Sequence, residues 1–356
     1  MALWSIPRSR KRLTIFGAYG GINAGDEMIL RALLQRIVRE SGADQHARVI
    51  VDRLPKGPSL TKDYVARDVV PVSFRDIARS LSGSWGSDLV IGGGQVIDGL
   101  NGIKYPLLQL AQALISKASG GQVSILGASC ARLENSGVRA VYARLFAACD
   151  AISARDEHSA QDIRAIGGTN LCPVKTEADL VFGMRDTITS NTPLADRKLI
   201  LLAPHHAPSL PLTDVEASAL LLEKLSKLGG DHEVRLILHD DRPDFDTHFV
   251  RRLRAIMGDA MPSASNPKTT DETIALYQQA RMVISVRMHP IIIGACAGAA
   301  CVPIKGSRKQ EDLAGRIGLT TVALTDAASK SPEALQKWFD CLPDQTALRD
   351  LERLAK

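Results

Sequence analysis

The sequence predicts an α/β protein with two domains, each built on a parallel sheet. Short β-branched runs alternate with longer amphipathic stretches along most of the 356 residues, which is typical of strands joined by crossover helices. The alternation is weakest over residues 184–197, which are rich in Thr, Ser, Asn, Asp and Pro. The length also favours two domains, since about 150 residues per domain is typical. We therefore expect two domains of similar size that face each other across a ligand-binding cleft.

The first half of the chain contains five apolar runs that we predict to be strands. They are Leu13–Phe16, Ala47–Val51, Leu89–Ile91, Val123–Leu126 and Ala151–Ser153. Helical periodicity between them predicts helices over Glu27–Glu40, Pro106–Ala118, Val138–Ala148 and Ser159–Ile166. We assign residues 1–190 to this first, Rossmann-like domain.

The second half repeats the pattern, which predicts a second Rossmann-like domain over residues 191–330. Its predicted strands are Leu199–Ala203, Val234–Leu238, Met282–Val286 and Cys301–Ile304. Its predicted helices are Val215–Leu228, Phe245–Met257, Asp271–Gln279 and Ile291–Ala299. We expect residues 331–356 to be helical and to pack back on the first domain.

The composition of the chain limits the kinds of partner that we expect it to bind. The net charge is only +5 and aromatic residues make up 4% of the chain, which argues against a nucleic-acid-binding protein. The six cysteines are far apart and form no zinc-binding spacing, so we expect apolar core residues in a reducing compartment. Arg251, Arg252 and Arg254 could bring the protein to an acidic membrane surface, but a solvated helix face is favoured.

The sequence shows no pattern typical of a signal peptide or of a membrane span. Residues 1–12 are basic and lack the apolar region of a signal peptide. No apolar run reaches the length of a membrane span. We therefore expect a cytoplasmic protein with no transmembrane segment.

The first candidate site follows the first strand, at Asn23-Ala24-Gly25-Asp26-Glu27. Carboxylates and amides there can bind the hydroxyl groups of a sugar, whereas Asp26 and Glu27 would repel a phosphate. The alternative is that the two carboxylates only stabilise the start of the helix. Both interpretations stay open for Asp26 and Glu27.

The second candidate site is the run Gly92-Gly93-Gly94 with Asp98, where a buried strand is predicted to end. Three glycines leave a surface free of side chains at the carboxyl end of a strand, where open α/β sheets bind ligands. A tight turn without ligand contact is the alternative. Because a turn needs fewer glycines, we favour a binding site.

The third and fourth candidate sites carry positive charge. Arg155 directly follows the strand Ala151–Ser153 and is well placed to bind an anion. Arg287 and His289 follow the strand Met282–Val286, with Pro290 expected at the first position of the next helix. The helix dipole, a guanidinium and an imidazole would then meet at one point and form an anion site with a titratable group.

Two further polar groups are weaker signals. The loop Lys305-Gly306-Ser307-Arg308-Lys309 could add phosphate contacts or be an ordinary solvated turn. His205, His206 and His239 follow strands, but their spacing is not that of metal ligands. We predict no metal site and leave the role of these three histidines open.

Together, the four motifs resemble those of the polysaccharide pyruvyl transferase family, from about Leu13 to about Leu319. The matching residues are Gly20-Gly21-Ile22-Asn23-Ala24-Gly25-Asp26-Glu27, Gly92-Gly93-Gly94 with Asp98, Ser153-x-Arg155-Asp156-x-x-Ser159 and Arg287-Met288-His289. Met288, Pro290 and Pro204-His205-His206 depart from the pattern of the family. The resemblance implies a fold similar to the two-domain GT-B glycosyltransferase type.

The resemblance also implies transfer of the pyruvyl unit of phosphoenolpyruvate onto two hydroxyls of a sugar in surface or exopolysaccharide synthesis, with release of phosphate. It assigns the donor site to Arg155, Arg287 and His289, which we predict to be catalytic. Ketal formation needs a general acid, and His289 is the only histidine placed within the anion site. We add Ser307 and Lys309 as candidate donor contacts, in the second domain. Candidate acceptor contacts, in the first domain, are Asn23, Asp26, Glu27, Gly93, Gly94 and Asp98.

No cofactor is implied beyond phosphoenolpyruvate as co-substrate, and the acceptor is expected to be a nucleotide-linked or lipid-linked saccharide. The catalytic base stays open among Asp26, Glu27 and Asp98. Two other functions fit the same residues. One is a GT-B-type glycosyltransferase that holds the diphosphate of a nucleotide sugar at Arg287 and His289. The other is a relative that binds a sugar or an anion without turnover.

Overall fold

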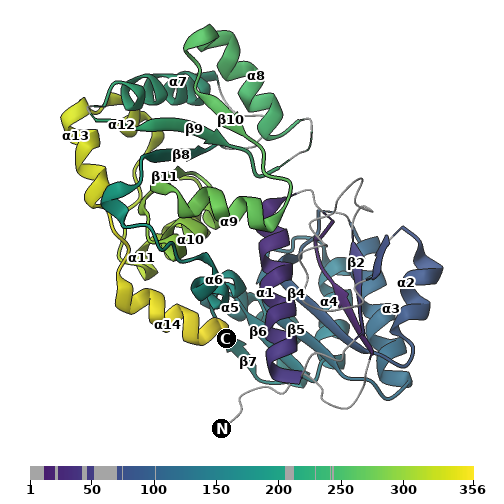
Figure 1. The fold of residues 1–356 in the computed structure, drawn as a ribbon. Coiled ribbons are helices and arrows are strands. Elements are labelled where there is room, and N and C mark those ends of the chain that lie inside the picture. The colour runs from purple at the N-terminus through teal and green to yellow at the C-terminus, as the bar shows by residue number, and fades with distance from the viewer. Residues whose placement is uncertain are drawn as a thin grey trace. The chain divides into compact units, whose positions relative to one another are not determined.

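Two parallel sheets organise the chain in the computed structural model, which describes residues 12–20, 23–41, 46–51, 70–73, 75–100, 102–204, 212–228, 230–240, 242 and 244–356 (Figure 1). The chain separates into two compact units. Unit 1 comprises Met1–Gly21, Asp26–Gly183 and Arg353–Lys356, and unit 2 comprises Ile22–Gly25 and Met184–Glu352. Each unit therefore contains a short piece of chain that is distant in sequence from the rest of it.

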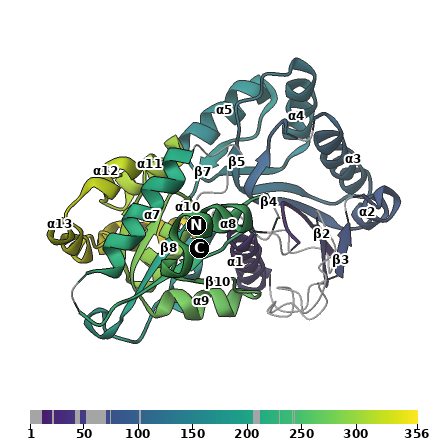
Figure 2. The same cartoon turned by 90° about the horizontal axis from the view of Figure 1, so that it is seen from above.

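Unit 1 contains, among its described residues, a seven-stranded sheet in the order β3-β2-β1-β4-β5-β6-β7. The strands are β1 (Arg12–Phe16), β2 (His46–Val51), β3 (Val70–Ser73), β4 (Asp88–Ile97), β5 (Val123–Cys130), β6 (Ala151–Ala154) and β7 (Val174–Thr176). The helices are α1 (Ala24–Ser41), α2 (Ile77–Ser84), α3 (Lys104–Ala118), α4 (Ser136–Ala148) and α5 (Glu157–Gly167). Helices α2 to α5 pack side by side on one face of the sheet, and α1 covers the other face (Figure 2).

The core of unit 1 lies between the central strands and the layer of α3 and α4. Ile91, Ile125 and Ile152 come from three neighbouring strands and are fully buried. Tyr142 and Phe146 of α4 pack in the same core, with ring centroids 5.8 Å apart. Because both faces of these strands are covered by helices, continuous apolar runs form them instead of alternating ones.

Unit 2 contains, in the part that is described, a five-stranded sheet in the order β10-β9-β8-β11-β12. The strands are β8 (Leu199–Ala203), β9 (Glu233–Ile237), β10 (Ser263–Ser265), β11 (Ala280–Ser285) and β12 (Ala300–Pro303). The helices are α6 (Arg185–Ile188), α7 (Leu212–Ser226), α8 (Asp246–Met257), α9 (Thr270–Gln278), α10 (Met288–Ala297), α11 (Arg308–Arg316), α12 (Leu324–Ser329), α13 (Pro332–Gln336) and α14 (Gln345–Ala355). The core of unit 2 lies between its sheet and α7, α8 and α12.

The most apolar segment of the chain forms the buried helix α10. All residues from Pro290 to Ala297 are buried, and the helix contacts β11, β12 and α9. Gly294 lets α10 approach the sheet, because a Cβ there would lie 2.8 Å from Cγ2 of Val283. No helix in the described ranges is long and apolar enough to cross a membrane.

The C-terminal segment forms two helices, whereas one helix was expected over residues 331–356. Helices α13 and α14 are separated by a 3-10 turn (Lys337–Asp340) and by residues 341–344, which include Pro343. Trp338 and Phe339 pack in the core of unit 2. The last four residues group with unit 1, where Nη2 of Arg39 donates to the carbonyl oxygen of Lys356 (3.0 Å).

Three short strands, β3, β7 and β10, were absent from the sequence prediction. All three lie at the edge of a sheet and have only three or four residues. The sequence segments of β7 and β10, Val-Lys-Thr and Ser-Ala-Ser, lack an apolar run because an edge strand has less surface to bury. All six cysteines are free thiols, and four of them, Cys130, Cys149, Cys296 and Cys301, are buried.

Candidate functional site

The carboxyl end of β11 positions Arg287 and His289 in unit 2. The strand order reverses between β8 and β11, and open α/β sheets bind ligands at such a reversal. Oγ of Ser285 accepts a hydrogen bond from the backbone N–H of Arg287 (2.8 Å), which turns the chain away from the sheet. Arg287 is the N-cap of α10, so His289 is its second residue and Pro290 its third. The expectation that Pro290 begins the helix was wrong by two residues, although Pro290 still lies in the first turn, where its missing N–H costs nothing.

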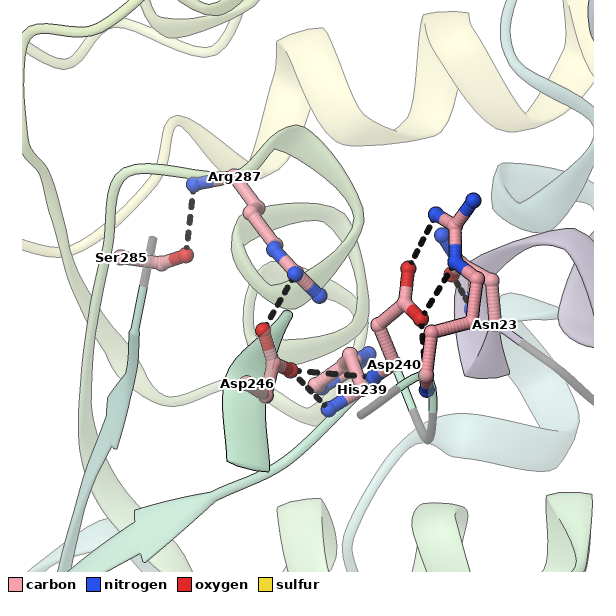
Figure 3. A network of polar contacts seen from close by, with 8 residues as sticks. Asn23, His239, Asp240, Asp246, Ser285 and Arg287 are labelled. Atoms are coloured by element: carbon pink, nitrogen blue, oxygen red, sulfur yellow. Dashed lines mark hydrogen bonds and ion pairs between the residues drawn. The ribbon is translucent and has the colours of Figure 1, made fainter. Parts of the chain in front are cut away.

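The guanidinium of Arg287 is held by a buried carboxylate. Nη2 of Arg287 donates to Oδ1 of Asp246, the fully buried first residue of α8 (2.5 Å; Figure 3). Nε and Nη1 of Arg287 are also buried, and no described residue accepts a hydrogen bond from either atom. Burial therefore lowers the pKa of Arg287, although Asp246 and Asp240 oppose this effect. A buried cation with two unused donors is a favourable place for an anion.

Asp246 also fixes the loop that follows β9. Its Oδ2 accepts hydrogen bonds from the backbone N–H groups of His239 (2.7 Å) and Asp240 (3.0 Å). Asp240 in turn accepts two hydrogen bonds from Arg242, at 2.8 and 2.6 Å (Figure 3). Burial raises the pKa of Asp246, while Arg287 and the two backbone N–H groups lower it. One carboxylate thus sets the positions of both Arg287 and the loop at residues 239–240.

His239 lies in the same network and is neutral. Its side chain is 4% exposed, and its Nε2 lies 2.7 Å from the hydroxyl of Tyr277 on α9. Burial lowers the pKa of His239 well below its ordinary value, and the positive charges of Arg287 and His289 act in the same direction. No described residue contacts its Nδ1 by a hydrogen bond. The sequence indicated only a polar residue here, and it gave no signal for the role of Tyr277.

The neutral state of His239 predicts a pH dependence of stability. A histidine in the unfolded chain binds a proton near pH 6.5, whereas folded His239 does not. As the pH falls below about 6.5, this group should therefore lower the free energy of unfolding by about 1.4 kcal/mol per pH unit. His239→Gln should remove this contribution and give a shallower decline between neutral and mildly acidic pH. Urea unfolding followed by tryptophan fluorescence measures the difference, and equal slopes would contradict it.

The beginning of α1 contacts this network from within unit 2. The backbone N–H of Ala24 donates to the carbonyl oxygen of His239 (2.8 Å), and Asn23 forms an antiparallel bridge with Asp240 (Figure 3). Oδ1 of Asn23 accepts from the N–H of Gly25 (2.9 Å), so this side chain stabilises the helix start. A Cβ on Gly25 would lie 2.3 Å from Nδ1 of His289. The first and fourth sequence motifs therefore meet, and Gly25 provides the space for the imidazole of His289.

Replacing Gly25 with Ala should displace the imidazole of His289. Alanine itself is favourable in a helix, so the cost comes from the overlap with His289. We expect turnover to fall about 10- to 100-fold, because small displacements of a reacting group are costly. The matched control is Gly315→Ala on α11, where a Cβ meets no atom within 4 Å. Steady-state kinetics of the two variants, with their thermal midpoints, test this prediction, and equal turnover would contradict it.

The predicted donor contacts Ser307 and Lys309 lie at the start of α11. Ser307 is the N-cap of this helix, and its Oγ accepts from the N–H of Gln310 (3.3 Å). The buried Gln310 donates from Nε2 to the carbonyl oxygen of Ser285 (2.7 Å), which fixes α11 beside the end of β11. Ser307 is exposed and Lys309 is partly buried. His205 and His206 lie outside the described residues.

The triple glycine of unit 1 does not end a strand as predicted. Strand β4 continues through Gly92, Gly93 and Gly94 to Ile97, with an irregular register after Gly94. Gly93 and Gly94 have φ angles of 61° and 71°, in the left-handed region that favours glycine. A Cβ on Gly93 would lie 1.9 Å from Cγ2 of Ile29 on α1. Gly93 is therefore needed for close packing of α1 on the sheet, and this need explains the glycine without a ligand.

The three carboxylates expected to bind the acceptor differ in their surroundings. Oε1 of Glu27, which is 1% exposed, accepts from the backbone N–H of Gly20 (2.7 Å) and so holds the loop after β1. Oδ1 of Asp98 accepts from the N–H of Leu100 (2.9 Å). Asp26 is partly buried, and its Oδ1 would lie 3.1 Å from a Cβ on Gly94. Asp26 is the most accessible of the three, and Glu27 supports the backbone.

Arg155 is an ion-pair partner inside unit 1 and is 6% exposed. Its Nη1 donates to Oδ2 of the buried Asp179 (3.2 Å), a residue that the sequence did not single out. The neighbours of Arg155 in its motif are also engaged. Asp156 caps α5 through the N–H of Ser159 (2.7 Å), and Oγ of Ser153 donates to Glu177 (2.8 Å). Arg155 is thus paired with a buried carboxylate, as Arg287 is with Asp246, and its role as an anion contact stays a prediction.

Metal-binding residue types do not cluster in the part of the chain that the structure describes. Among these residues, no group of three or more His, Cys, Asp or Glu side chains could hold a metal ion. His239, Asp240 and Asp246 are instead used in hydrogen bonds with Tyr277, Arg242 and Arg287. The polar residues after β9 therefore form an internal network.

Solved structures with a similar fold include proteins bound to nucleotide sugars. A UDP-N-acetylglucosamine 2-epimerase from Neisseria meningitidis, bound to UDP-N-acetylglucosamine, has a TM-score of 0.61 and 10% identity, with 97% of each chain covered. Anabaena Alr3699/HepE in complex with UDP-glucose has a TM-score of 0.58 and 11% identity, with 97% of this chain and 93% of that chain covered. These identities establish the fold alone, and the expected GT-B-type architecture of two Rossmann-like units is confirmed.

Sequence comparison gives a more specific result. A search of curated proteins finds no match to this chain. The family model of polysaccharide pyruvyl transferases matches residues 23–308, which include Asn23, Arg155 and the Arg287-Met288-His289 motif. Since this match covers most of the sequence, the protein belongs to the polysaccharide pyruvyl transferase family.

Proposed function

We propose that this protein transfers the pyruvyl unit of phosphoenolpyruvate onto two hydroxyls of a saccharide, forming a cyclic ketal and releasing phosphate. The observation that carries this proposal is the pair of buried donors on Arg287, Nε and Nη1, for which no described residue provides an acceptor. Buried donors normally have partners, so a site that leaves two of them on one guanidinium is suited to an anionic ligand.

Phosphoenolpyruvate carries a phosphate and a carboxylate, and unit 2 offers donors for both. The unused N–H groups of Arg287, on Nε and Nη1, can each donate to an anionic oxygen of phosphate or carboxylate. The first N–H groups of α10 have no acceptor within the helix, and no side chain caps them. Ser307 and Lys309, at the start of α11, are proposed as additional donor contacts.

The reaction needs an acid, for which we propose His289. Its proton would go to the methylene carbon of the donor, which leaves positive charge at the adjacent carbon. One saccharide hydroxyl adds to that carbon and gives up its proton, and the second hydroxyl then displaces phosphate. Two C–O bonds to the saccharide form, one C–O bond to phosphate breaks, and the two hydroxyl protons balance the new methyl group and the phosphate.

The neutral imidazole of His239 contributes a dipole to this site and adds no positive charge of its own. The buried Nδ1 of His239 can accept or donate one hydrogen bond, depending on the tautomer. We propose that His239 orients the donor or the attacking hydroxyl.

The proposed acceptor is a nucleotide-linked or lipid-linked saccharide of surface-polymer synthesis, modified in the cytoplasm. The similar structures in complex with UDP-glucose and UDP-N-acetylglucosamine support the nucleotide-linked form. Asp26 and Asp98 are proposed to orient a hydroxyl of the acceptor. No further cofactor is proposed.

Incubation of the protein with phosphoenolpyruvate and a panel of nucleotide sugars tests the function, with mass spectrometry to detect a pyruvate ketal and an assay for released phosphate. Phosphoenolpyruvate alone should raise the thermal midpoint, because a ligand of the folded state stabilises it. The similar nucleotide-sugar structures make a glycosyltransferase the second candidate. Stabilisation by UDP alone, with sugar transfer and no phosphate release from phosphoenolpyruvate, would replace the first proposal with the second.

A further inference from the structure

The exposed apolar side chains are concentrated on one side of unit 1. The described part of the chain has ten large apolar residues with exposed side chains, and six of them lie between residues 77 and 114. They are Ile77, Trp85, Leu100, Ile103, Leu107 and Leu114. Leu100 is 82% exposed and Trp85 is 63% exposed. These residues belong to α2, α3 and the loop before α3, all in the helix layer on one face of the sheet (Figure 2).

Three of these residues form a stripe along α3. Ile103, Leu107 and Leu114 are separated by four and seven residues, so they lie on the same side of the helix. Other positions of α3, including Leu110 and Ala113, are buried against the sheet. The stripe is therefore separate from the core-facing side of α3, and its three side chains are exposed.

The same layer of helices carries excess positive charge. Over residues 75–148, seven Lys and Arg side chains are exposed, against two exposed carboxylates, Asp76 and Glu134. Lys117 is paired with Asp150, and the other exposed basic residues include Lys104, Arg139 and Arg144. Gly137 lies near the stripe, because a Cβ there would be 3.6 Å from Cδ1 of Ile103. Arg144 is seven residues after Gly137 and thus lies on the same side of α4.

We propose that this outward surface of α2, α3 and α4, the basic apolar face, binds the surface of a bilayer that contains anionic lipids. Peripheral binding needs two weak contributions together: apolar side chains that enter the interface and basic side chains that attract anionic headgroups. The basic apolar face provides both on neighbouring helices. The inference is independent of the reaction, since it rests on a helix layer of unit 1 outside the donor site of unit 2.

A second copy of this chain fits the basic apolar face less well than a bilayer. Two-fold pairing brings the same surface together from both copies, so it would place the excess positive charge of one copy opposite that of the other. The exposed surface of α8 is also basic, but it lacks a group of exposed apolar side chains. Arg251 and Arg254 on α8 are exposed, but their neighbour Ile256 is a single exposed apolar residue.

Co-sedimentation with lipid vesicles tests the proposal. The wild-type protein should bind vesicles that contain phosphatidylglycerol, should not bind pure phosphatidylcholine, and should be released at high salt. The variants Leu107→Gln/Leu114→Gln and Lys104→Gln/Arg144→Gln should each lose about tenfold or more in partitioning. The matched control, Arg251→Gln/Arg254→Gln/Ile256→Gln on α8, should bind as the wild type does.

The changes are at exposed positions, so thermal midpoints should stay close to that of the wild type. Turnover on a soluble acceptor should also stay unchanged, which separates this proposal from the proposed function. Failure of the wild type to bind anionic vesicles would overturn the inference, as would equal loss in the α8 control. A dimer in light scattering that Leu107→Gln/Leu114→Gln converts to a monomer would overturn it in favour of self-association.

Discussion

Replacing His289 with Gln is expected to lower turnover about 10²- to 10⁴-fold, the usual contribution of a positioned acid or base. Glutamine keeps a side chain that can form hydrogen bonds, but it has no proton of suitable acidity to give to the methylene carbon. Gly25 leaves room for the side chain at this position, and His289 is only partly buried, so the fold should survive. Initial rates of phosphate release, together with circular dichroism, measure both effects.

The pH profile separates an acid from a merely structural histidine. A proton donated by His289 makes turnover depend on pH, and His289→Gln should change the shape of that pH profile. His248→Gln, at a partly buried position on α8 of the same unit, is the control and should behave like the wild type. A folded His289→Gln variant with ordinary turnover would exclude His289 as the acid.

Replacing Arg287 with Lys is expected to weaken donor binding about 100-fold or more. One guanidinium nitrogen holds Asp246 and two others remain for the donor, whereas the ammonium of lysine cannot reproduce this planar arrangement. Loss of two charge-assisted hydrogen bonds, each worth about 1.5–3 kcal/mol, accounts for this magnitude. The effect should appear as a higher KM for phosphoenolpyruvate and a smaller thermal shift with this donor.

Arg281→Lys is the matched control, because Arg281 lies on β11, the strand that precedes Arg287. Arg281 donates to the carbonyl oxygen of Ala195 (3.0 Å) and lies over the ring of Phe339 (4.7 Å), so its contacts are internal to unit 2. This variant should keep the wild-type KM. Equal effects of the two substitutions on KM would show that Arg287 acts through stability and does not contact the donor.

The central strands and long helices were predictable because burial forces a strong pattern on them. The predicted strand Leu199–Ala203 agrees with β8 at both ends, and the helix predicted over Val138–Ala148 differs from α4 by two residues at its start. The edge strands β7 and β10 were missed because they consist largely of polar or small residues. Their formation depends on a neighbouring strand that is already in place.

The candidate site was also predictable only in part. Arg287 and His289 were found because charged residues that directly follow an apolar strand are unusual and the fold class says where strand ends lie. Asp246 and Tyr277 come from α8 and α9 and gave no comparable signal for a site. A buried carboxylate is recognisable only when its partner, Arg287, is known.

Two of the predicted contact residues also have structural roles that the sequence did not reveal, for the same reason. Gly93 was predicted to contact a ligand, but it is needed where Ile29 of α1 packs closely. Arg155 was predicted to contact an anion, and the structure adds an ion pair with Asp179 that the sequence did not reveal. In both cases the residue was recognised as unusual, but the neighbour that explains it, Ile29 or Asp179, is distant in sequence.

The sequence by itself determined the α/β class, the two sheets and the arginine and histidine at the end of β11, because hydrophobic periodicity and the residues that follow a strand are local properties. Only the tertiary structure decided which of the charged residues are compensated, that Gly25 makes room for His289 and that His239 is neutral. Compensation and desolvation depend on contacts between segments up to several hundred residues apart, and no local pattern encodes them.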